Sequence, residues 1–105
     1  MSLKDFIEHT GYKMQTTFWE DFSAADSYGE AAVLDTYKRC FDEWKGDYIY
    51  LTELVMVLNW KIWQHYYGEN MILSNVYDEL FNKCASYAQD NLTEEELRYY
   101  YRVTD

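Results

Sequence analysis

A seven-residue pattern occurs twice in this chain, at residues 28–34 and again at residues 67–73. Both copies read Tyr-Gly-Glu, then two variable residues, then a β-branched residue and a leucine. Glycine tolerates the left-handed backbone that ends many helices, and a pair of apolar residues is typical of the buried face of a helix. The pattern therefore predicts two sharp corners, at Gly29 and Gly68, each joining two helices through a glycine cap.

The rest of the chain also has a helical pattern. It contains four glycines and no proline, and each glycine falls where the helical spacing of apolar residues stops. Thr17 and Thr93 are each followed three residues later by glutamate, as in a capping box, and Asp47 is a suitable N-cap. We therefore expect helices over residues 3–10, 17–28, 30–45, 48–67, 71–90 and 93–102.

These elements predict an all-α fold that forms a single domain over residues 1–105. The helix at 48–67 is apolar around most of its circumference, which places it at the centre of a compact bundle of five to six helices built from antiparallel hairpins. The alternative is a short array of helical hairpins resembling tetratricopeptide repeats. Such repeats are about 34 residues long and need about three copies for stability, so the bundle is favoured.

The charge of the chain limits its partners. There are 19 acidic and 9 basic residues, a formal charge of −10, and this disfavours direct binding to nucleic acids or to anionic membranes. The longest apolar run, residues 54–58, is too short to span a bilayer, and the N-terminus does not resemble a signal peptide. Cys40 and Cys84 each fall on an apolar stripe, which predicts buried thiols without a disulfide. We expect a cytoplasmic protein.

The sequence contains no template for catalysis. Neither cysteine has a histidine nearby in sequence, no glycine-rich loop is present to bind phosphate, and adjacent carboxylates on a helix point about 100° apart. His65 and Glu69 are four residues apart, but Gly68 interrupts the helix between them and no second ligand pair exists. We expect that the protein is not an enzyme and that it has no cofactor and no metal.

Aromatic residues make up 20% of the chain. Most are expected in the core and at its boundary, where a tyrosine ring packs while its hydroxyl reaches water. Aromatic side chains that stay exposed anchor many protein interfaces, so the first functional hypothesis is a protein–protein interaction module. The candidates for contact with a protein partner or with a second copy of the chain are Trp19, Trp44, Trp63, Tyr99, Tyr100 and Tyr101.

The acidic residues support an alternative hypothesis, an acidic nucleic-acid mimic that inhibits a host enzyme. The candidate acidic face consists of Glu20, Asp21, Asp35, Asp42 and Glu43. A mimic must present carboxylates along an extended face. The acidic excess is instead similar in the two parts of the chain, −6 through Glu53 and −4 beyond it, so an ordinary solvated surface is the favoured interpretation.

Four segments carry a family resemblance: residues 16–23, 35–39 and 50–61, and the closing pair Thr104-Asp105. Together they resemble a family of small acidic proteins encoded on phages and integrative elements of Gram-positive gut bacteria. The resemblance would cover most of the chain. It implies a bacterial cytoplasmic setting and an accessory role for a mobile element, and it carries over no catalytic or binding residue because the family has no assigned activity.

Overall fold

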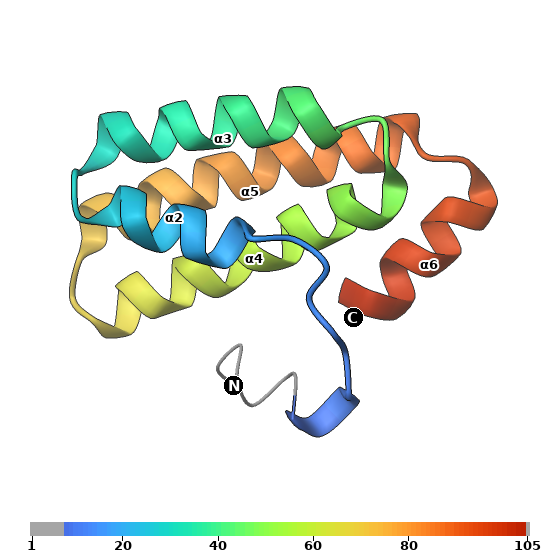
Figure 1. Cartoon of the computed structure of the whole chain (residues 1–105), viewed down its shortest axis with the longest axis horizontal. Helices are drawn as coiled ribbons and strands as arrows, with labels where there is room; N and C mark the ends of the chain where they lie inside the picture. The colour runs from blue at the N-terminus through green and yellow to red at the C-terminus, as the bar shows by residue number, and fades with distance from the viewer. Residues whose placement is uncertain (1–7, 105) are drawn as a thin grey trace.

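The computed structural model describes residues 8–104, and it confirms the all-α fold: no strand occurs in that range (Figure 1). The expected helix over residues 3–10 lies mostly outside the described residues, although residues 8–10 are helical. The five helices that follow are α2 (Phe18–Asp26), α3 (Glu30–Trp44), α4 (Tyr48–Tyr67), α5 (Met71–Asn91) and α6 (Glu94–Thr104). Their bounds lie within about two residues of those expected.

Helix α4 is the centre of the bundle, as expected. It packs against α2, α3, α5 and α6, most extensively against α5. Figure 1 shows α3 and α5 running side by side and α2 lying over α4. Helix α6 folds back beside the first turns of α4. The Cα radius of gyration is 13.1 Å, close to the ~13 Å of a compact folded chain of this length. The compact bundle is confirmed.

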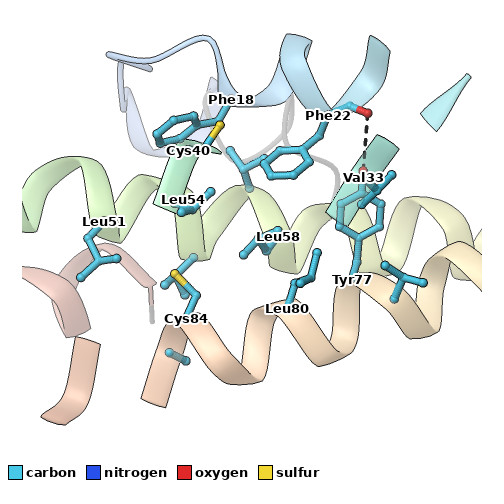
Figure 2. Packing of buried hydrophobic residues seen from close by; sticks show 14 of the residues in the cluster. Phe18, Phe22, Val33, Cys40, Leu51, Leu54, Leu58, Tyr77, Leu80 and Cys84 are labelled. Carbon is cyan, nitrogen blue, oxygen red and sulfur yellow. Dashed lines mark hydrogen bonds between the residues drawn. The ribbon is translucent and has the colours of Figure 1, made fainter. Parts of the chain in front are cut away.

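The core is one hydrophobic cluster to which all five helices contribute (Figure 2). Leu54 and Leu58 of α4 lie between Phe22 of α2 and Cys84 of α5 and are fully buried. Cys40 and Cys84 are both buried and free, as expected. Burial raises the pKa of the Cys40 thiol to about 11 and that of Cys84 to about 12, so both stay protonated and unreactive at neutral pH.

Two of the three expected helix caps are present. The Asp47 carboxylate accepts hydrogen bonds from the backbone N–H groups of Ile49 and Tyr50. Thr93 and Glu96 form a reciprocal capping box, with distances of 2.9 and 3.3 Å. The capping box expected at Thr17 is wrong, because its hydroxyl donates to the Asp21 carboxylate at 3.0 Å and caps no backbone group.

The two corners of the repeated pattern differ in backbone geometry. Gly29 is the N-cap of α3, with φ 103° and ψ −169°, a region open almost only to glycine. Gly68 has an ordinary φ of −82°, and the left-handed residue there is Glu69, with φ 62°. The expectation of a left-handed glycine is therefore met at Gly29 and wrong at Gly68. Helix α2 ends at Asp26, before the tyrosine of the pattern, whereas α4 ends on Tyr67 itself, so the same letters occupy different positions in the two turns.

Substitution of Gly29 should be costly for a backbone reason alone. No atom lies within 4 Å of the position that a Cβ would take at Gly29 or at Gly46, but only Gly29 has a positive φ. We expect Gly29→Ala to lower the free energy of unfolding by about 1–3 kcal/mol, and Gly46→Ala to leave it unchanged or raise it by up to about 1 kcal/mol. Urea denaturation measures both, and equal effects of the two substitutions would contradict the assigned geometry.

Candidate functional site

Two charged side chains are completely buried in the central helix. Glu53 and Lys61 are the only Asp, Glu, Lys or Arg residues of α4, and both have 0% exposure. A buried charge is tolerated only when it is paired and hydrogen-bonded. Sequence reasoning did not select either residue. The available signal was a charged residue on a helix that is apolar on nearly every side, which forces the charge to face a neighbouring segment.

The Glu53 carboxylate binds the segment that leads into α2. It accepts hydrogen bonds from the Tyr12 hydroxyl at 2.8 Å, from the backbone N–H of Gln15 at 3.0 Å and of Thr16 at 2.8 Å, and from the Thr16 hydroxyl. Burial, and then the bond to Glu53, raise the pKa of the Tyr12 phenol well above its usual range. Glu53 thus fixes residues 12–16 against α4 and satisfies backbone groups that would otherwise be buried without partners.

The Lys61 ammonium binds the end of α2. Its Nζ donates to Asp26 Oδ2 at 2.9 Å and to Ser23 Oγ at 2.7 Å, and it lies 4.2 Å from the centre of the Trp19 ring. Burial lowers the pKa of Lys61, and the hydrogen bond and charge of Asp26 oppose that shift. All three partners of the ammonium belong to α2, so the lysine holds one face of that helix onto α4.

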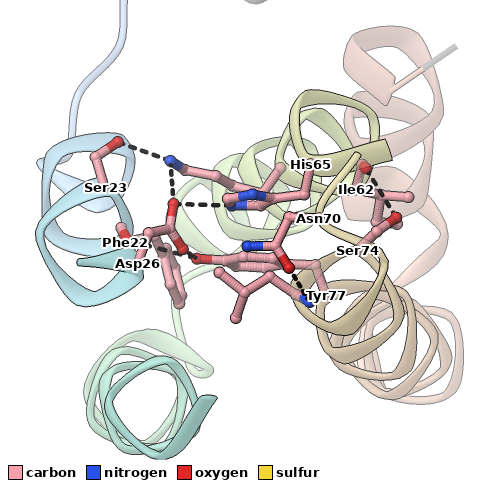
Figure 3. A network of polar contacts seen from close by, with 10 residues as sticks. Phe22, Ser23, Asp26, Ile62, His65, Asn70, Ser74 and Tyr77 are labelled. Atoms are coloured by element: carbon pink, nitrogen blue, oxygen red, sulfur yellow. Dashed lines mark hydrogen bonds and ion pairs between the residues drawn. The ribbon is translucent and has the colours of Figure 1, made fainter. Parts of the chain in front are cut away.

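Asp26 connects three helices through a single carboxylate (Figure 3). Besides Lys61, it accepts a hydrogen bond from the Tyr77 hydroxyl of α5 at 2.5 Å, and its Oδ2 lies 2.9 Å from His65 Nε2 of α4. The His65 ring stacks on Tyr77 with its plane only 5° from parallel. Burial, and then Asp26, raise the pKa of the Tyr77 phenol well above its usual range. His65 is half-buried at the boundary of the core, as expected.

The chemistry of this network suits a structural role. Ser23 and Lys61 are the residue types of a nucleophile and a base, but a lysine acting as a base must be unprotonated. Lys61 Nζ instead forms an ion pair with the Asp26 carboxylate, which favours the protonated form, and it donates to Ser23 Oγ. Every buried side-chain nitrogen and oxygen of residues 8–104 has a hydrogen-bond partner within the chain. Within the same range, no group of three His, Cys, Asp or Glu residues could hold a metal ion.

A groove of about 730 Å³ lies elsewhere, between α4, α5 and α6. Trp60, Phe81 and Tyr100 line it together with the amides of Asn59 and Asn82, and none of its lining residues is Asp, Glu, Lys or Arg. Its wall also includes His9 and Thr10, which belong to the helical residues 8–10. The groove and the Asp26 network share no residue. None of the helices within residues 8–104 is long and apolar enough to cross a membrane.

Exposed apolar side chains gather at the end of the bundle that contains both glycine corners. The hydrogen bonds of Asp26 to α4 and α5 bring the two corners together, and Figure 1 shows both at the same end of the molecule. Of eight exposed large apolar residues in the described range, all but Tyr101 belong to this end. We call this surface the corner face; it consists of Tyr28, Leu34, Trp63, Tyr66, Tyr67, Met71 and Ile72.

The most exposed members of the corner face are Tyr28, Tyr67 and Ile72, at 85%, 77% and 69%. The rings of Trp63, Tyr66 and Tyr67 contact one another, with centroids 5.3 to 6.1 Å apart. Of these residues, only Trp63 was among the candidates selected from the sequence. Tyr28, Tyr66, Tyr67 and Ile72 were not selected. Tyr28 and Tyr67 are the tyrosines of the repeated pattern, so their place in the turns was the signal that could have found them.

The six aromatic residues selected from the sequence do not form one surface. Trp63 lies on the corner face, and Tyr101 is exposed on α6. The half-buried members contact neighbours instead: Trp19 lies under Lys61, Trp44 packs on Tyr50, and Tyr99 packs on Tyr48. Tyr100 is only 4% exposed. Its ring belongs to the hydrophobic core, so Tyr100 is not among the exposed aromatic residues.

The five acidic residues selected from the sequence do not form an unbroken row. Glu20, Asp35, Asp42 and Glu43 are exposed, whereas Asp21 is half-buried and accepts the hydrogen bond from Thr17. Asp35 and Asp42 are seven residues apart and share a face of α3, since seven residues make about two helical turns. Lys38 lies between them on that face and is also exposed, so a positive charge interrupts the row.

Comparison of the chain with models of protein families, with curated proteins and with solved structures found no match in any of the three. The resemblance to proteins of phages and integrative elements therefore stays a prediction from the sequence.

The buried pair of Asp26 and Lys61 leads to a stability prediction. Asp26→Ala leaves an ammonium buried without its counter-ion, and breaking such a pair costs about 3–5 kcal/mol. The double substitution Asp26→Ala/Lys61→Met removes both charges, so we expect it to be more stable than Asp26→Ala alone. Asp21→Ala is the matched control on the same helix, and it should cost no more than about 1 kcal/mol.

Urea denaturation of the four chains measures these differences. A double variant that is no more stable than Asp26→Ala would contradict the proposed pairing, and so would equal effects of Asp26→Ala and Asp21→Ala.

Proposed function

We propose that this protein is a non-enzymatic protein-binding module and that the corner face is its binding surface. The observation that carries the proposal is the concentration of exposed apolar side chains at one end of the bundle. Burial of apolar area is favourable by about 25 cal/mol per Å², so a large exposed apolar cluster is typical of a surface that a partner covers. Tryptophan and tyrosine are also the residues that most often dominate binding energy.

The interior network supports this proposal because it makes the corner face rigid. Asp26, two residues before Tyr28, is held by Lys61, His65 and Tyr77. The last turns of α4 and the first turns of α5 therefore keep a fixed position relative to the end of α2. A preorganised surface loses less conformational entropy on binding, which favours recognition by the folded protein as it stands.

We also propose a cytoplasmic location, a mobile-element origin and a protein partner for this module. The family resemblance supports an accessory role for a bacterial mobile element, and the two unpaired cysteines are consistent with a cytoplasmic location. The charge of −10 supports a protein partner over direct binding to nucleic acid or to an anionic membrane. Mimicry of nucleic acid receives no comparable support, because Lys38 interrupts the acidic row on α3.

The test compares the proteins captured from a lysate of the encoding organism by three tagged chains. Tyr67→Ser/Ile72→Ser removes two highly exposed side chains of the corner face, and Tyr101→Ser removes an exposed aromatic ring elsewhere. Quantitative mass spectrometry should show a captured protein that is retained by the wild-type chain and by Tyr101→Ser and is lost, about tenfold or more, with Tyr67→Ser/Ile72→Ser. Equal capture by all three chains would contradict the proposal.

A further inference from the structure

The two chain segments that contain the corner face carry acidic residues but no lysine or arginine. They are residues 26–37, from the end of α2 to the middle of α3, and residues 62–82, from the end of α4 to the middle of α5. Together they contain six of the 19 acidic residues and none of the nine Lys and Arg residues. Lys61 directly precedes the second segment and is buried in its pair with Asp26.

Exposed carboxylates lie at both corners. Glu30 is the first residue of α3, directly after Gly29, and Glu69 directly follows Gly68; both side chains are exposed. The carboxylate of Asp26 is different, since the buried Lys61 pairs with it. Asp78 and Glu79 are exposed on α5 two turns beyond Met71 and Ile72. None of these four exposed carboxylates forms an ion pair with another residue of the range 8–104, so negative charge lies beside the apolar residues of the corner face.

We propose that the corner face binds a basic amphipathic segment of a partner protein, one that presents arginine beside apolar side chains. This inference rests on the binding surface proposed above and names the chemistry of its partner. Arginine pairs with carboxylates through two parallel hydrogen bonds and also stacks on aromatic rings. Carboxylates at positions 30 and 69 beside the exposed rings of Tyr28 and Tyr67 offer both kinds of contact, and Ile72 and Met71 receive the apolar side chains.

The same charges disfavour two other occupants. In a symmetric dimer the corner face of a second copy would place one set of carboxylates against the other, and like charges across an interface cost several kcal/mol. An anionic bilayer would repel the surface for the same reason. A basic protein segment is the occupant whose charge complements the surface.

The probes are three synthetic peptides of equal length. One carries leucine at helical spacing with arginine on the other face, the second replaces each arginine by glutamate, and the third has the composition of the first with the leucines dispersed. Isothermal titration calorimetry with the wild-type chain should show binding of the first peptide, at least about tenfold tighter than of the other two.

Charge reversal locates the binding site. Glu30→Lys/Glu69→Lys should weaken binding of the first peptide about tenfold or more, and Tyr67→Ser/Ile72→Ser should weaken it similarly. Asp42→Lys/Glu43→Lys makes the same change in net charge away from the corners, and it should alter affinity by no more than about twofold at physiological salt, where surface charges are screened beyond ~8 Å.

The outcomes separate this inference from the proposed function. Equal binding of the arginine and glutamate peptides at the corner face would overturn the inference that the partner is basic, but it would leave the proposed binding surface in place. So would the absence of any peptide binding if capture from lysate still depends on Tyr67 and Ile72. Dimerisation, or binding to phosphatidylcholine vesicles, that is lost in Tyr67→Ser/Ile72→Ser would also overturn the basic partner, because it would identify a different occupant.

Discussion

The position of α2 in this structure depends on two buried charged residues of α4, each of which requires a hydrogen-bonded partner. Glu53 and Lys61 have no water available, because α4 is covered by other helices, and each finds its partners in residues 12–26. A nine-residue helix such as α2 is too short to be stable alone. Its position therefore follows from these two attachments together with the burial of Phe18 and Phe22, and the entry into α2 and its exit are both fixed to the central helix.

This interior arrangement determines the surface. The carboxylate of Asp26 brings the end of α2 to the end of α4 and the beginning of α5, so the two glycine corners become neighbours. The tyrosines of the repeated pattern then lie exposed at the same end of the molecule although they are far apart in sequence. The acidic residues of two separate segments are brought together in the same way. The pattern that first indicated a fold thus also marks the surface to which we assign a function.

The helices and their central member could be predicted from the sequence, because apolar spacing, glycine positions and local caps act over a few residues. The prediction of a cap at Thr17 failed because its hydroxyl donates to Asp21 one turn later. The local sequence pattern does not determine which of the two hydrogen bonds forms. The roles of Glu53 and Lys61 could not be predicted, because their partners are about 35 to 41 residues away. The uneven charge was hidden for a similar reason: a division of the chain at its midpoint averages over segments that the fold brings together.

Native-state hydrogen exchange of the variant Glu53→Gln/Lys61→Met tests the central role of the two buried ions most directly. If these ions hold α2 in place, the amides of α2 should exchange faster than in the wild-type chain by local opening, while the amides at the centre of α4 and α5 keep their protection. Unchanged protection of α2, or an equal loss of protection in all three helices, would contradict the account.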